Sequence, residues 1–207
     1  RRFDRALNAG ALLALTHPLS RMRLDVVLVG PGEAFPRRVW RPGDKLTPDN
    51  SLQLEIRVDR DAYVTVVDVD AAGGLELLFP TPHAEEGFLP EGRVRGRRTV
   101  RIPDSLARDN AAGFHWPLAA PGGVDTLQVF ATTDLGTAQR IRRQVSAASV
   151  GETGAPAMRG ASGRLGLAAL REELAARDVR SRGGTEDSSA GPDGDWTSAT
   201  VRIRIVE

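Results

Sequence analysis

Cysteine is absent from the 207-residue sequence, and its absence excludes several kinds of site. A chain without thiols has no disulfide framework, no thiolate metal ligand and no cysteine nucleophile. Lysine is scarce too, because Lys45 is the single lysine and arginine supplies nearly all of the positive charge. This imbalance is typical of GC-rich bacterial genes, so we expect a bacterial origin. The compartment stays open between cytoplasmic and exported.

A large net charge and long apolar runs are missing as well. The formal net charge is +1, so no overall field attracts nucleic acid or an anionic membrane. The apolar stretch over residues 9–15 is too short to span a bilayer. We therefore expect no nucleic-acid and no membrane partner. Because residue 1 is Arg and not Met, we also expect an excised or processed piece of a longer protein.

The strongest local signal is a β-hairpin over residues 62–80. Residues 62–69 are rich in β-branched side chains and apolar at most positions, which predicts a strand covered on both faces. Residues 71–74 tolerate positive φ, so the chain can reverse and the apolar residues after them can pair back. Pro80 lacks an N–H and ends the ladder.

Other segments with strand periodicity surround this hairpin. Short turns separate them, which is the pattern of a mainly β, Ig-like antiparallel β-sandwich and not of βαβ units. A loop with buried anchors at Leu106 and Phe114 is expected over residues 104–115. The predicted strands cover residues 22–29, 52–58, 97–102, 127–133 and 196–206.

Helical spacing occurs near both ends of the chain. Phe3, Leu7, Ala11 and Leu15 predict a short amphipathic N-terminal helix, which we interpret as a linker from a preceding domain over residues 1–20. A helix-forming mixture predicts one helical insertion near residues 161–178, before the last strand. Leu167, Leu170 and Leu174 form its apolar stripe.

The domain organisation follows from these elements. Residues 180–194 are polar and rich in Gly and Ser, which predicts a flexible loop. Since the last predicted strand returns to the sheet after this loop, residues 21–207 are interpreted as a single β-sandwich domain.

A family resemblance rests on an ordered string of short motifs. Together they resemble the bacterial domain of unknown function 4384, which typically lies C-terminal to caspase-like cysteine peptidase domains. The resemblance implies a β-sandwich beside a catalytic domain, and it brings no catalytic residues. The motifs are Leu12-Leu13-Ala14-Leu15 before Pro18, Trp40-x-Pro42-Gly43-Asp44-Lys45-Leu46, Asp61-Ala62-Tyr63-Val64, Val69-Asp70-Ala71-x-Gly73, Leu78-Phe79-Pro80, Gly92, Ile102-Pro103 and Ala120-Pro121-Gly122.

Carboxylates and histidines are the side chains here with candidate metal-binding or acid–base chemistry. Asp68 and Asp70 share one face of a strand and are weak candidates for a cation site, because the further carboxylates that calcium requires are missing from the spacing. Solvent-facing turn aspartates fit better, so we expect no metal and no cofactor. His83 and His115 lack a Ser or Cys nucleophile in a suitable motif. We therefore expect no enzymatic activity from this chain.

The most concentrated charge in the chain is a run of arginines, which is the candidate binding site. Nucleic-acid sites usually interleave aromatic residues for stacking, and none occurs within the run. A solvated strand edge that discourages aggregation is one interpretation. An acidic protein partner, bound through bidentate carboxylate contacts, is the functional one. The run consists of Arg93, Arg95, Arg97, Arg98 and Arg101.

Four aromatic residues are the basis of the remaining alternative. Trp40, Tyr63, Phe114 and Trp116 could line a sugar-binding face, although most aromatic residues of such a sandwich belong in its core. We interpret the chain as a non-catalytic accessory module, for recognition or regulation, attached to a catalytic domain that resembles a caspase-like peptidase. The alternative is a stand-alone hydrolase or a carbohydrate-binding domain.

Overall fold

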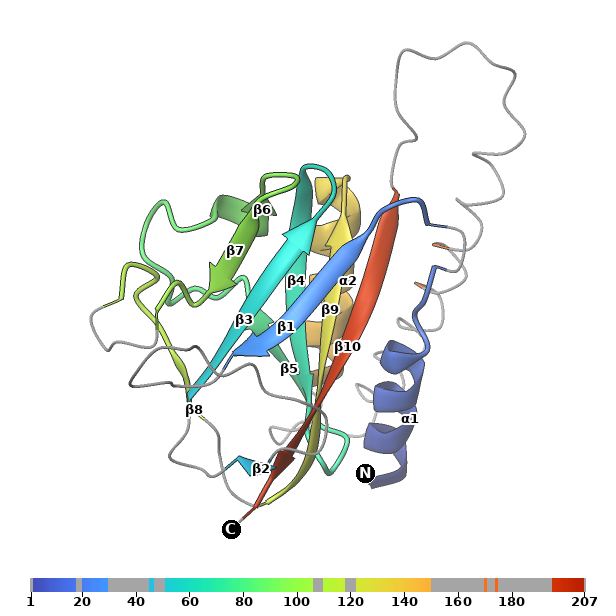
Figure 1. Ribbon diagram of the computed structural model, residues 1–207. Coiled ribbons are helices and arrows are strands. Elements are labelled where there is room, and N and C mark those ends of the chain that lie inside the picture. Colours follow the sequence, from blue (N-terminus) through green and yellow to red (C-terminus); the bar gives the residue numbers. More distant parts are fainter. Residues whose placement is uncertain are drawn as a thin grey trace, which may run out of the picture.

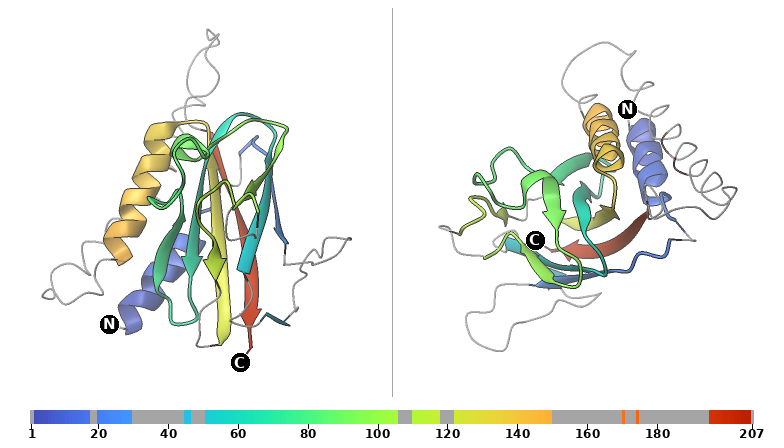
Figure 2. Two further views of the ribbon diagram at one scale, coloured as in Figure 1. Left: turned by 90° about the vertical axis from the view of Figure 1, so that its left-hand side faces the viewer. Right: turned by 90° about the horizontal axis from the view of Figure 1, so that it is seen from above.

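The computed structural model has three layers, two facing β-sheets and a layer of helices against one of them (Figures 1 and 2). It describes residues 2–17, 20–29, 45–46, 51–105, 110–117, 122–149, 170, 174 and 195–206. The predicted antiparallel β-sandwich with an N-terminal helix and a helix before the last strand is confirmed.

The smaller sheet has four strands and is antiparallel throughout. Its order is β1-β3-β7, with β8 also paired to β3. Alternation along β3 buries Leu54 and Ile56 against the other sheet, while Arg57 is exposed. The strands are β1 (Leu24–Val29), β3 (Ser51–Val58), β7 (Thr99–Ile102) and β8 (Trp116–Pro117).

The larger sheet has six strands in the order β2-β10-β9-β4-β5, with β6 also paired to β4. All of its pairs are antiparallel except the short parallel pair of β2 and β10. The strands are β2 (Lys45–Leu46), β4 (Ala62–Val69), β5 (Leu75–Phe79), β6 (Arg93–Val94), β9 (Gly123–Thr132) and β10 (Trp196–Ile205).

The central hairpin is formed by β4 and β5, as predicted. Gly73 has φ +83° in the turn, a conformation that glycine adopts without the steric cost of a Cβ. β4 is covered on both faces: Val64 and Val66 belong to the core between the sheets, and Val67 and Val69 to the core under the helices. Six of its eight residues are therefore buried, which explains its near-continuous apolar sequence.

The helical layer covers the outer face of the larger sheet (Figure 2). It consists of α1 (Arg2–Leu13) and α2 (Leu135–Ser149). The predicted apolar stripe is right for Leu15, which is buried, and for Ala11, which packs against the core, and it is wrong for Leu7, which is 37% exposed. Ala9 and Leu12 are buried in its place. Helical spacing alone allows more than one face for a helix so rich in Ala and Leu, and the packing against the sheet selects this one.

Helix α2 was not predicted, although the sequence carries its signals. Asp134 precedes the helix and its carboxylate accepts the backbone N–H of Thr137 at 2.7 Å, which is an N-cap. Ala138, Ile141 and Val145 then follow at helical spacing and are all fully buried. Residues 127–133 were predicted as a strand, and the helix N-cap at Asp134 and the apolar stripe of α2 begin directly after it.

Three other predictions differ from the structure or lie partly outside it. β7 begins at Thr99 and not at residue 97, because Arg97 has φ +63° and lies in a turn. Of the helix predicted near residues 161–178, the described residues are Leu170 and Leu174, which are helical and buried. Leu106, Phe3, Trp40 and the loop over 180–194 lie outside the residues whose side chains are described.

The last strand returns to the sheet as predicted. β10 pairs with β9 from Trp196 opposite Thr132 to Ile205 opposite Gly123. Ile203 and Ile205 are buried in the core, and Arg202 and Arg204 are exposed. In the described part of the chain, neither helix combines the length and apolar character that crossing a membrane requires.

Candidate functional site

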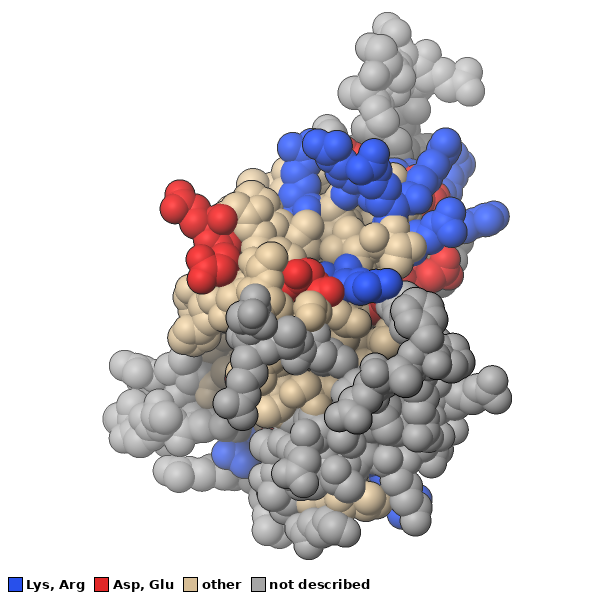
Figure 3. All heavy atoms as spheres, turned by 60° about the vertical axis from the view of Figure 1, so that its left-hand side comes forward, with Lys and Arg blue, Asp and Glu red and all other residues tan. Residues whose placement is uncertain are grey.

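The five arginines of the predicted binding site lie at one end of the sandwich, on β6, on β7 and on the turn between them. Figure 3 shows basic side chains gathered at the upper end of this face, with acidic ones at its margins. All five arginines are exposed. Because β6 pairs with β4 and β7 pairs with β3, the turn crosses from the larger sheet to the smaller one. We call Arg95, Gly96, Arg97 and Arg98 the arginine turn.

The backbone of the arginine turn is held by contacts with the loop between β3 and β4. Gly96 donates its N–H to Oδ1 of Asp61 at 2.9 Å, and Arg97 donates its N–H to the carbonyl oxygen of Val58 at 2.6 Å. A Cβ on Gly96 would lie 2.5 Å from the Cα of Arg60, so no larger residue fits there without a shift of the backbone. The arginine side chains therefore project from a preorganised turn.

The ion pairs divide the arginines into two groups. Arg93 contacts Asp61 at 3.6 Å, and Nε of Arg101 lies 2.9 Å from Oε1 of Glu55. Arg95, Arg97 and Arg98 form no ion pair with any described residue. Three guanidinium groups on one fixed turn are thus available to an external carboxylate, which a guanidinium binds with two parallel hydrogen bonds.

One further arginine belongs to this surface and was missed in the sequence. Arg57 is exposed on β3 and pairs in register with Thr99 of β7, so it lies beside the start of that strand. Like the turn arginines, it has no ion pair with a described residue. The alternation of residues 52–58 marks Arg57 as solvent-facing, but only the β3–β7 register brings it next to the arginine run.

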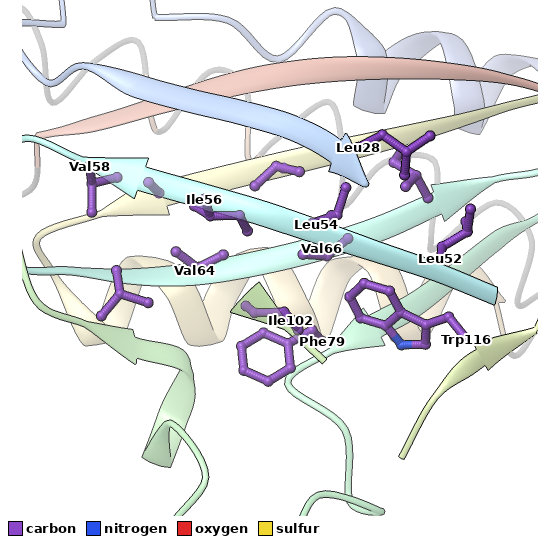
Figure 4. Packing of buried hydrophobic residues seen from close by; sticks show 14 of the residues in the cluster. Leu28, Leu52, Leu54, Ile56, Val58, Val64, Val66, Phe79, Ile102 and Trp116 are labelled. Atoms are coloured by element: carbon purple, nitrogen blue, oxygen red, sulfur yellow. The ribbon is translucent and has the colours of Figure 1, made fainter. Parts of the chain in front are cut away.

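A hollow of about 600 Å³ opens at the other end of the sandwich. Figure 4 shows Leu52 and Trp116 at the end of the core, and both line the hollow. Asp68 lines the hollow from the larger sheet. Side chains of a strand alternate between its two faces, so Asp68 points to the same inward side as Val64 and Val66 of β4. Three more carboxylates line the hollow, those of Asp70, Glu76 and Asp125.

Asp68 is the most perturbed of these carboxyls. Its Oδ1 is buried and has no hydrogen-bond partner among the described residues. Burial raises the pKa of Asp68 to about 7, and the charges of Asp125, Asp70 and Glu76 act in the same direction. The prediction that both strand aspartates face solvent is therefore wrong for Asp68, because the inward side of β4 continues past the core into this hollow.

Asp70 has a structural role in the turn. Its Oδ1 accepts the backbone N–H groups of Ala72 at 2.7 Å and Gly74 at 2.8 Å. This pattern closes an Asx-type turn and engages Oδ1 of the carboxylate. Among the described residues, no group of three His, Cys, Asp or Glu side chains is arranged to hold a metal ion.

The two histidines of the hollow do not complete an acid–base pair with its carboxylates. His83 and His115 are both exposed and line its rim. Among the described residues, neither imidazole forms a hydrogen bond with a carboxylate. Neither of these two histidines is therefore oriented as a general base against Asp68.

The described aromatic residues are mainly core residues. Phe114 and Trp116 are buried, with ring centroids 5.7 Å apart, and Phe79 stacks on Phe114 at 6.3 Å. Tyr63 is partly buried within β4. These rings stabilise the sandwich and do not form an exposed flat sugar-binding platform.

A known family model matches the segment that contains the arginine turn and most of the residues lining the hollow. Residues 45–134 match the family model described as Domain of unknown function (DUF4384). The segment is similar to DUF4384. The matched residues include β2 to β9, and α1, β1, α2 and β10 lie outside the DUF4384 segment. The resemblance stated from the motifs is confirmed to this extent, and the association with a caspase-like peptidase stays a prediction.

No curated protein and no solved structure matches the chain.

Proposed function

We propose that this chain is a non-catalytic accessory module of a larger bacterial protein, and that it recognises an acidic protein segment for an attached catalytic domain. A caspase-like peptidase is the proposed catalytic domain, on the strength of the motifs shared with DUF4384. The observation that carries the proposal is the group of guanidiniums of Arg95, Arg97 and Arg98 on a fixed turn, none of which has an ion-pair partner among the described residues. Nucleic acid fits this surface less well, because residues 93–103 contain no aromatic residue that could stack on a base.

A peptide of consecutive glutamates tests the proposal by fluorescence anisotropy. The double substitution Arg95→Gln with Arg98→Gln should weaken its binding about tenfold, since each lost guanidinium removes a charge-assisted contact. The matched control is Arg202→Gln with Arg204→Gln, which removes the same charge from two exposed arginines on β10. If both double variants lost the same affinity for the peptide, binding would depend only on the net charge of the protein, which would contradict the proposed site.

A carbohydrate-active domain is the second candidate, and one observation favours it. The pKa of Asp68 is raised to about 7 in a hollow that Asp125 also lines, and glycosidases use two carboxyls whose pKa values differ. Against it, Oδ1 of Asp68 is buried and Asp70 is occupied by its turn.

Assays with chromogenic glycosides and casein separate the two functions. We expect no turnover from the purified chain. Turnover that persists through repurification and disappears in the double variant Asp68→Asn with Asp70→Asn would assign the chain to the hydrolases. Deletion of the module from its parent protein should instead change the activity or targeting of the attached catalytic domain.

A further inference from the structure

Among the described residues, the outer edge of β7 pairs with no other strand. β7 is the last strand in the order β1-β3-β7, and its one partner in this part of the chain is β3 (Figure 1). Among the described residues, no backbone group outside β3 forms a backbone hydrogen bond with Thr99–Ile102. As far as the described part of the chain shows, the N–H and C=O groups that point away from β3 can therefore pair with another strand.

The charge along this edge has one sign. Residues 93–103 contain five arginines and no carboxylate. Thr99 and Arg101 are exposed on the outer face of β7, and Arg97 and Arg98 directly precede the strand. A second copy of the same edge is repelled by this charge, whereas an acidic strand is attracted.

The inward face of the edge is apolar. Val100 is partly buried and Ile102 fully buried, and both belong to the core between the sheets. Phe88 and Leu89 also pack against this core and are partly exposed. A strand added beside β7 would meet arginines on one face and an apolar rim on the other, so its residues should alternate between acidic and aliphatic.

We propose that the acidic partner binds as an extended strand that adds to the edge of β7, with alternating acidic and aliphatic residues. The acidic side chains contact the arginines, and the main-chain hydrogen bonds continue the sheet. This inference rests on the proposed function, because it gives the binding mode for the same arginines. This binding mode requires more than charge, because the bound peptide must also have free backbone N–H groups on the side that faces β7.

The test uses three labelled peptides of identical sequence, alternating Glu and Val. One is unmodified, one is N-methylated at the Glu residues and one at the Val residues. In an extended strand, the N–H groups of the two sets point to opposite edges. Strand addition therefore predicts that one N-methylated peptide binds at least tenfold more weakly, while the other binds like the unmodified peptide. A fourth peptide of the same composition, with the Glu and Val residues in two blocks, should bind weakly as well.

Each alternative gives a different result. Equal binding of all four peptides, lost in the Arg95→Gln and Arg98→Gln double variant, would overturn strand addition and leave the proposed function intact. Equal weakening by both N-methylation patterns would also overturn it. Absence of binding for every acidic peptide would overturn both. Sedimentation that finds a dimer whose formation excludes the peptide would assign the edge to a second copy of the chain and overturn the proposal.

Discussion

Asp68 of β4 lies directly opposite Glu76 of β5, so the central hairpin carries two facing carboxyls where the core gives way to the hollow. Like charges directly opposite each other on a sheet are destabilising. Asp68 is the partly buried member of the pair and Glu76 the exposed one. The cost of ionisation therefore falls on Asp68, and it makes stability depend on pH.

Stability should fall as the pH rises through the interval between the unfolded and folded pKa values of Asp68. The folded pKa is raised from 3.8 to about 7, so between these values the native state holds a proton that the unfolded state has lost. The contribution is fully present below the lower value and is lost above pH 7, on the order of 2–4 kcal/mol. The Asp68→Asn variant should show a flatter dependence of the unfolding free energy between pH 5 and 8, measured with urea.

The control for this experiment is Glu76→Gln, which neutralises the exposed partner and keeps the titrating group. It should retain most of the wild-type slope. Parallel curves for the wild type and Asp68→Asn would show that Asp68 does not control the pH dependence.

Gly96→Ala should destabilise the protein by about 1–3 kcal/mol through overpacking. The added methyl would lie 2.5 Å from the Cα of Arg60 and 2.6 Å from its carbonyl carbon, and neither backbone atom can rotate away. Binding of acidic peptide should weaken with it, because the turn that displays the arginines must move. Gly10→Ala is the matched control, since its Cβ meets nothing within 4 Å in α1 and should stabilise by roughly 0.5–1 kcal/mol. Equal stabilities in urea for the two variants would contradict the predicted clash.

Arg142→Leu should cost about 2–4 kcal/mol, because it leaves buried acceptors without donors. Arg142 of α2 donates to Oγ1 of Thr65 at 3.0 Å, to the carbonyl oxygen of Val64 at 3.3 Å and to that of Glu91 at 2.9 Å. Its side chain is 11% exposed, and it connects α2 to β4 and to the 3₁₀ turn Pro90–Gly92 before β6. Thermal unfolding measures the loss. Arg143→Leu, on the exposed side of the same helix, should change the melting temperature little, and an equal effect of both would argue against the bridge.

Truncation after residue 194 should unfold the domain. It removes β10, whose ten residues pair with β9 and bury Trp196, Ile203 and Ile205. Three buried side chains of this size contribute about 5–8 kcal/mol, which is comparable with the whole stability of a typical domain. Circular dichroism of the truncated protein should lose the β signal and the cooperative transition. A control truncated after Ile205 keeps every paired residue, and a shared melting temperature for both proteins would mean that β10 is a dispensable tail.

Much of the sheet structure could be read from local patterns. Alternation at Leu52, Leu54 and Ile56 and the turn at Gly73 predicted β3 and the central hairpin, because strand periodicity and positive φ are properties of a few consecutive residues. The return of β10 was predicted for the same reason. The arginine run was predicted as a candidate binding site because five like charges within nine residues can be seen in the sequence itself.

The sites themselves depend on contacts between residues distant in the chain. Asp68 looked like a solvent-facing turn residue, and only the facing sheet, with Leu52 and Trp116, encloses it in a hollow and raises its pKa. The buried face of α1 was likewise selected by the sheet on which it packs.

By itself, the sequence determined the longer strands, the turn of the central hairpin and the charge of the arginine run, because each arises from neighbouring residues. Tertiary structure decided which charges stay unpaired. Asp61 and Glu55 reach Arg93 and Arg101 across strand pairs, and no carboxylate among the described residues reaches Arg95, Arg97 or Arg98. The open edge of β7 was decided in the same way, since the order of strands in a sheet follows from packing two apolar faces together and not from any single segment.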